Sequence, residues 1–226
     1  MKPLLPRCSF FALLLVALAF AGLSSLALAA PADWTKEINA LTARDAKNPP
    51  PANGVVFVGS SSIRLWKTLA QDFPDVTTIN RGFGGSELAD SVFHADRIVL
   101  PYRPRAVVLF AGSNDLKSGK TPEAVAADFK AFRNKLHATL PEARLLYLSI
   151  TLAPSRAQIH EAMQAANRLI AADCATDPRC TFVDINPPMQ GPDGKVRPDL
   201  FVKDQLHLNR DGYAIWTKVL GPHLKP

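Results

Sequence analysis

Short apolar runs alternate with amphipathic segments along most of the chain. The runs are rich in Val, Ile, Leu and Phe, are bounded by turn residues, and have the length of buried β-strands. They cover residues 55–58, 76–79, 106–111, 145–150 and 181–185. Apolar positions at helical spacing predict helices over residues 34–47, 63–73, 87–100, 122–140, 157–172 and 212–220.

This alternation predicts an α/β fold. Strands without polar positions are buried on both faces, as in a parallel sheet whose crossover helices cover both sides. Because such crossovers are right-handed, five strands of this kind give a three-layer α/β/α sandwich with a five-stranded parallel sheet. A chain of 226 residues with 47% hydrophobic content can bury one sizeable core, so we expect a single domain.

The first 29 residues have the pattern of a secretory signal peptide. Lys2 and Arg7 precede an apolar run that starts at Phe10 and ends in the small-x-small sequence Ala27-Leu28-Ala29. The run is long enough to be kept as a membrane anchor, but Gly22 and its Ala-rich end favour cleavage. We therefore expect a signal peptide over residues 1–29, and a mature domain over 30–226 in the periplasm or outside the cell, without a stable membrane span.

Charge and cysteine content narrow the function further. Loss of Lys2 and Arg7 leaves 24 basic and 20 acidic residues, with no run of like charges, so nucleic acid is a poor candidate partner. Cys8 would be removed with the signal peptide, so Cys174 and Cys180 are the remaining thiols of the mature domain. An even pair of cysteines in an oxidising compartment predicts a disulfide. A metal site is the alternative, but two Cys without a nearby His supply at most half of a ligand set.

Polar and glycine-rich clusters follow the first three predicted strands, and a fourth cluster lies in the loop between the fifth strand and the last predicted helix. In a parallel sheet, ligands bind beyond the carboxyl ends of the strands, so these positions are the ones expected to carry chemistry. The clusters are Gly59-Ser60-Ser61-Ser62, Asn80-Arg81-Gly82-Phe83-Gly84-Gly85, Gly112-Ser113-Asn114-Asp115 and Asp204-Gln205-Leu206-His207-Leu208. Together they supply a nucleophile, hydrogen-bond donors, a base and an acid, which is what acyl transfer requires.

Each cluster alone has an ordinary structural explanation. A Ser at a strand-to-helix turn is more often a helix cap, glycines permit tight turns, and Asn or Asp residues form local turns or caps. Their joint placement at one edge of the sheet favours the functional interpretation. Competing motifs are incomplete: residues 59–63 lack the last Gly of the α/β-hydrolase elbow, residues 82–87 lack the third Gly of a dinucleotide fingerprint, and residues 114–121 lack the first Gly of a phosphate loop.

These clusters, in this order, resemble the motif blocks of the SGNH hydrolases, also called GDSL-type esterases and lipases. The first block usually reads Gly-Asp-Ser, and here Ser60 replaces the acid before Ser61. The resemblance runs from about Trp34 to Leu224 and is nearest to the platelet-activating-factor acetylhydrolase-like branch. It implies a flavodoxin-like sheet and a serine hydrolase.

The resemblance also implies roles for five residues. Ser61 is the expected nucleophile, His207 its general base, and Asp204 the acid that orients His207. The expected oxyanion hole consists of the backbone N–H groups of Ser61 and Gly85 and the side-chain amide of Asn114.

The sequence therefore predicts an esterase that cleaves carboxylic esters of small molecules or carbohydrates, with short acyl or acetyl groups, and that uses no cofactor or metal. A lysophospholipase or thioesterase of the same fold is the alternative, because the fold does not choose among these substrates. A non-catalytic binding module is the other alternative. The oligomeric state is not predicted.

Overall fold

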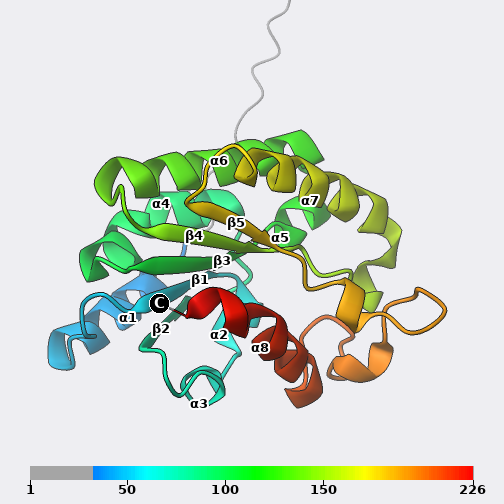
Figure 1. The fold of residues 1–226 in the computed structure, drawn as a ribbon, viewed down its shortest axis with the longest axis horizontal. Coiled ribbons are helices and arrows are strands. Elements are labelled where there is room, and N and C mark those ends of the chain that lie inside the picture. Colours follow the sequence, from blue (N-terminus) through cyan, green and yellow to red (C-terminus); the bar gives the residue numbers. More distant parts are fainter. Residues whose placement is uncertain (1–32, 226) are drawn as a thin grey trace, which may run out of the picture. The chain divides into compact units, whose positions relative to one another are not determined.

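The computed structural model describes residues 33–225, which contain a five-stranded parallel sheet in the order β2-β1-β3-β4-β5 (Figure 1). The strands are β1 (Val55–Gly59), β2 (Thr78–Gly82), β3 (Ala106–Phe110), β4 (Arg144–Leu148) and β5 (Cys180–Val183). The chain starts in β1, moves outward to β2, and then returns past β1 to β3, β4 and β5. The strand order thus reverses between β1 and β3, which is where open α/β sheets bind ligands.

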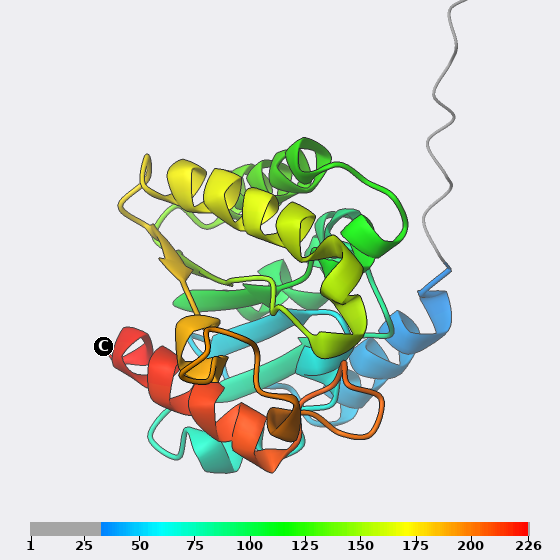
Figure 2. The same cartoon turned by 90° about the vertical axis from the view of Figure 1, so that its right-hand side faces the viewer.

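Helices cover both faces of this sheet, as Figure 1 and the turned view in Figure 2 show. One face packs against α1 (Thr35–Lys47), α4 (Leu88–Ile98), α6 (Pro122–Thr139) and α7 (His160–Cys174). The other packs against α2 (Ser61–Arg64), α3 (Leu69–Asp72) and α8 (Arg210–Leu224). Shorter elements are α5 (Ser113–Lys117), η1 (Leu100–Tyr102), η2 (Pro154–Ile159), η3 (Pro187–Met189) and η4 (Pro198–Leu200). The predicted three-layer α/β/α sandwich is confirmed.

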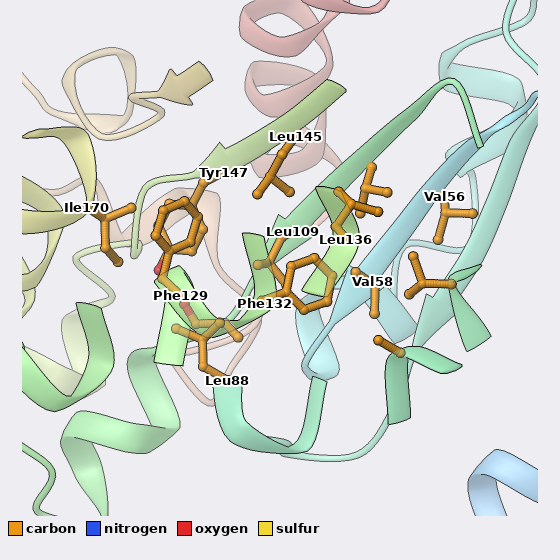
Figure 3. Packing of buried hydrophobic residues seen from close by; sticks show 14 of the residues in the cluster. Val56, Val58, Leu88, Leu109, Phe129, Phe132, Leu136, Leu145, Tyr147 and Ile170 are labelled. Atoms are coloured by element: carbon orange, nitrogen blue, oxygen red, sulfur yellow. The ribbon is translucent and has the colours of Figure 1, made fainter. Parts of the chain in front are cut away.

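The two helical layers produce two separate hydrophobic cores. Successive side chains of a strand point to opposite faces, so each strand contributes to both cores. Figure 3 shows Val58, Leu109 and Tyr147 on the face that also receives Phe129 and Phe132 of α6. The alternate strand residues join the second core beneath α2, α3 and α8. Burial on both faces is what makes the central strands β1 and β3 apolar throughout their length.

The single helix predicted over residues 63–73 is wrong, because two short helices, α2 and α3, occupy this segment. Trp66 is buried between them, and its indole N–H donates to Asp72 Oδ2 over 2.7 Å. The Thr68 hydroxyl donates to the same oxygen over 2.8 Å. These local side-chain bonds hold a turn in place of a continuous helix.

The second strand is also displaced from its predicted range, 76–79, to Thr78–Gly82. Its later half contains Arg81, which is buried and donates to Asp45 Oδ1 of α1 over 2.7 Å. A buried ion pair hides this part of the strand from a search for apolar runs.

The predicted signal peptide, residues 1–29, and its boundary with the domain at residue 30 lie outside the described residues. Between residues 33 and 225, no helix is both long enough and apolar enough to cross a bilayer.

Candidate active site

Ser61 begins α2 directly after β1, at the carboxyl edge of the sheet. The turn depends on Gly59, whose φ is 133°, because a Cβ there would lie 1.9 Å from the carbonyl oxygen of Phe110. Next to it, the Ser60 N–H donates to the same Phe110 oxygen over 3.0 Å. The β1–α2 turn is thus fixed to the end of β3, and Ser61 is half-buried at its tip.

His207 reaches Ser61 from the loop between η4 and α8. The distance from Ser61 Oγ to His207 Nε2 is 2.8 Å. The loop is held locally, since the Val202 N–H donates to the His207 carbonyl oxygen over 2.8 Å and Phe201 forms an isolated bridge with Leu208. The structure therefore brings together a hydroxyl and an imidazole that are 146 residues apart in sequence.

Asp204 lies on the other side of the same imidazole, with Oδ2 2.6 Å from His207 Nδ1. Its Oδ1 accepts the backbone N–H groups of Leu206 and His207 over 2.9 and 3.0 Å. Partial burial raises the pKa of Asp204, but the hydrogen bonds from His207 and Leu206 outweigh this effect and hold the pKa below its ordinary value. An ionised Asp204 keeps the proton on Nδ1 and leaves Nε2 as an acceptor for the Ser61 hydroxyl.

Gly85 and Asn114 lie together at the same edge. Gly112, with φ of 112°, directly precedes the short helix α5. Asn114 Nδ2 donates to the Ser86 carbonyl oxygen over 3.1 Å, and a Cβ on Gly85 would lie 3.7 Å from this nitrogen. An amide nitrogen has two hydrogens, so Asn114 can donate the second one to a ligand.

Asp115 joins this corner of the site to the protein interior. Its carboxylate is fully buried and accepts the Leu88 N–H at the start of α4, over 3.0 and 3.2 Å to the two oxygens. Lys120 Nζ lies 3.2 Å from Asp115, 3.0 Å from Glu87 and 2.9 Å from Asp128. Burial raises the pKa of Asp115 to about 6 despite the neighbouring ammonium group. This network fixes α5 and Asn114 against the loop that contains Gly85.

Ser61 and Asn114 line a small cavity of about 20 Å³. The other residues that line it are Ser60, Ser62, Phe110, Ser113, Thr151, Ala153, Leu206, Leu208 and Trp216. Sequence reasoning missed the contribution of Thr151 and Ala153, which follow β4. The strand-end rule that identified the other clusters applies equally to β4 and would have pointed to these residues.

The remaining predicted pair, Cys174 and Cys180, is buried, and both cysteines are free thiols in the structure. Their Sγ atoms are 2.8 Å apart. The two thiols are therefore neighbours, and the disulfide between them stays a prediction.

Across residues 33–225, no group of three or more His, Cys, Asp or Glu side chains is arranged to hold a metal ion.

Several solved structures share this fold. A protein from Streptococcus pneumonia described as a platelet activating factor has a TM-score of 0.74 and 18% identity, covering 84% of this chain and 92% of its own. A GDSL-like lipase from Bacteroides thetaiotaomicron has a TM-score of 0.70 and 22% identity, covering 83% and 96%. A mutant of an acetyl-xylooligosaccharide esterase from Geobacillus Stearmophilus has a TM-score of 0.62 and 12% identity, covering 78% and 96%. At these identities the likeness shows the shared fold.

Sequence comparison assigns the family. No curated protein matches the chain. The family model described as the GDSL-like Lipase/Acylhydrolase family matches residues 52–215, which span the segment from before β1 into α8 and include all four motif blocks. The chain therefore belongs to the GDSL-like lipase/acylhydrolase family of carboxylic ester hydrolases, also known as SGNH hydrolases.

Proposed function

We propose that the protein is a secreted serine esterase that hydrolyses short-chain acyl esters, including acetyl esters, through an acyl-enzyme. The main support is the continuous contact from Ser61 Oγ through His207 to Asp204, with distances of 2.8 and 2.6 Å. Asn114 lines the same cavity as Ser61, so a donor for the developing oxyanion is also close.

In the first half of the reaction, Ser61 Oγ attacks the ester carbonyl carbon while its proton passes to His207 Nε2. Asp204 stabilises the imidazolium that forms. The negative charge on the former carbonyl oxygen is met by the N–H groups of Ser61 and Gly85 and by Asn114 Nδ2. Because these donors are fixed before reaction, they need little reorganisation as the charge develops.

The tetrahedral intermediate then collapses, and the bond to the alcohol oxygen breaks. His207 gives its proton to that oxygen, and the alcohol leaves. Water then attacks the acyl group on Ser61 and passes a proton to His207, which returns it to Ser61 Oγ as the carboxylic acid departs. The reaction regenerates the enzyme and consumes one water molecule.

The volume beside Ser61 favours short acyl groups. A cavity of about 20 Å³ has room for about one water-sized group, which is the size of the terminal group of a short acyl chain. A long acyl chain would have to extend over the surface instead, so a lysophospholipase activity is less well supported. The similar fold of the acetyl-xylooligosaccharide esterase is compatible with an acetylated carbohydrate as substrate.

Export is part of this proposal and rests on the signal-peptide pattern of residues 1–29. In an oxidising compartment, the adjacent thiols of Cys174 and Cys180 would form a disulfide. Protein recovered from the periplasm or medium should begin at residue 30 and should be two hydrogens lighter than its reduced form by mass spectrometry. A retained N-terminus, or two thiols that alkylate without reductant, would contradict these two points separately.

The activity itself is tested by hydrolysis of 4-nitrophenyl esters from acetyl to palmitoyl, with Ser61→Ala as the matched inactive variant. We expect kcat/KM to be highest for the shortest acyl groups and to fall steadily with chain length. A maximum at palmitoyl would favour the lysophospholipase alternative. Hydrolysis that is equal in Ser61→Ala would exclude the proposed mechanism.

A further inference from the structure

Three residues that line the cavity beside Ser61 each contain a buried polar atom without a hydrogen-bond partner within residues 33–225. They are Ser113 Oγ, Thr151 Oγ1 and Trp216 Nε1. Thr151 is 6% exposed and Trp216 is fully buried. The three residues come from α5, from the segment after β4 and from α8, so their arrangement around one cavity is a product of the fold.

Buried polar groups in proteins are almost always paired, because an unpaired group loses its bonds to water without replacement. Three such groups belong to residues that line one cavity, so each is free to pair with a polar atom of a bound ligand. Ser113 and Thr151 have hydroxyls that donate and accept, whereas the Trp216 indole only donates. A hydroxyl oxygen matches this set, since it accepts from the indole and exchanges hydrogen bonds with the other two. A methyl group matches none of them.

The size and position of the cavity limit which group of a substrate can enter it. The volume of about 20 Å³ admits about one water-sized group, and Ser61 lines the same cavity. A group held there while Ser61 attacks the carbonyl carbon is attached to the adjacent carbon of the acyl group. Phe110, Leu206 and Leu208 also line the cavity. Apolar side chains lower the local polarity, and a hydrogen bond is stronger in less polar surroundings.

We propose that Ser113, Thr151 and Trp216 form a polar acyl subsite that selects 2-hydroxyacyl esters, such as glycolyl esters, over alkyl esters of equal size. The inference rests on the proposed esterase function and adds the chemical class of the acyl group. Acetyl esters still fit, because they are smaller, but they leave the three polar atoms unpaired. Glycolyl and propionyl groups differ only by a hydroxyl in place of a methyl group, so this pair isolates the effect.

The experiment measures kcat/KM for phenyl glycolate and phenyl propionate, each divided by the rate of its hydroxide-catalysed hydrolysis to remove intrinsic reactivity. We expect the normalised glycolyl rate to exceed the propionyl rate by about tenfold or more in the wild-type protein. Thr151→Val keeps the shape of the side chain and removes the hydroxyl, so the ratio should fall about tenfold. Thr181→Val, an equivalent change on β5 outside the cavity lining, should leave the ratio unchanged.

The outcomes separate this inference from the esterase proposal. Equal normalised rates for the two esters would overturn the polar subsite and leave the esterase function standing, with water as the occupant of the cavity. A Thr151→Val variant that loses both activities equally would also overturn it. If Thr151→Val does not fold, as judged by circular dichroism, Ser113→Ala replaces it with the same expected direction. Failure to hydrolyse either ester, or phenyl acetate, would overturn the esterase proposal itself.

Discussion

Asp204 and His207 lie three residues apart in one loop, whereas Asn114 and Asp115 belong to a network that joins several elements. The side chains of His207 and Asp204 are 24% and 47% exposed, and apart from the bond between His207 and Ser61 their hydrogen bonds lie within one loop. Asp115, in contrast, is fully buried and contacts the first turn of α4 and Lys120. Changes on the His207 side should therefore affect chemistry alone, and changes on the Asn114 side should affect both chemistry and stability.

The largest expected effect is at Ser61, which lies between the two regions. Ser61→Ala removes the atom that forms the acyl-enzyme, so kcat for a short ester should fall by about a million-fold, while the melting temperature stays the same. Steady-state kinetics and thermal unfolding measure the two quantities. Ser60→Ala and Ser62→Ala are matched controls, because both residues line the same cavity, and they should keep far more activity. An inactive Ser60 or Ser62 variant beside an active Ser61→Ala would show that the motif register is wrong.

The next largest effect is expected at Asp204, in the exposed loop that also contains His207. Asp204→Asn preserves the size of the side chain but no longer holds His207 in the required tautomer, so we expect kcat to fall by about 10⁴ with little change in KM. Since Asp204 is half exposed, the free energy of unfolding should change by less than about 0.5 kcal/mol. A loss of less than about tenfold in kcat would remove Asp204 from the catalytic group.

A smaller effect on rate is expected on the buried side. Asn114→Ala removes one oxyanion donor, which should lower kcat by about 10²- to 10³-fold. The variant also loses the bond from Asn114 Nδ2 to the Ser86 carbonyl oxygen, so a stability loss of about 1 kcal/mol should accompany it. Kinetics combined with urea unfolding would detect both. A large stability change without a change in kcat would assign Asn114 a structural role only.

The smallest effect concerns pH and the buried charge. Burial raises the pKa of Asp115 to about 6, well above the ordinary value for an aspartate side chain. A carboxyl group whose pKa is raised by folding contributes stability that is complete below its unfolded pKa and is lost as the pH rises through its folded pKa. Relative to Asp115→Asn, the wild-type protein should therefore lose about 2 kcal/mol of unfolding free energy between about pH 4 and about pH 7. Urea unfolding across this range measures the difference, and a constant or increasing difference would contradict it.

The layers of the fold follow from features that the sequence displays directly. The central strands β1 and β3 are buried on both faces and apolar throughout, and polar clusters lie at the carboxyl ends of β1, β2 and β3. The sequence does not reveal which polar residues are buried with a hydrogen-bond partner. Arg81 is buried in β2 by its bond to Asp45, and Trp66 and Thr68 end α2 through bonds to Asp72, contacts that no local pattern reveals.

The candidate site divides in the same way. Ser61, His207, Asp204, Gly85 and Asn114 were predicted from motif blocks, and the structure places them at one edge of the sheet. Trp216 was not predicted, because it belongs to no motif and joins the cavity only through tertiary packing, whereas Thr151 could have been found from its place after β4. The volume of a cavity and the unpaired atoms around it depend on three-dimensional packing, which spacing along the chain does not encode.

The most direct test of this account is covalent labelling with a fluorophosphonate, which reacts with a serine activated by its base. We expect the wild-type protein to gain one adduct, located by peptide mass spectrometry on Ser61, and Ser61→Ala to gain none. Asp204→Asn should label much more slowly than the wild type. An adduct on Ser60 or Ser62, or equal labelling of Ser61→Ala, would contradict the assignment of Ser61 as the nucleophile.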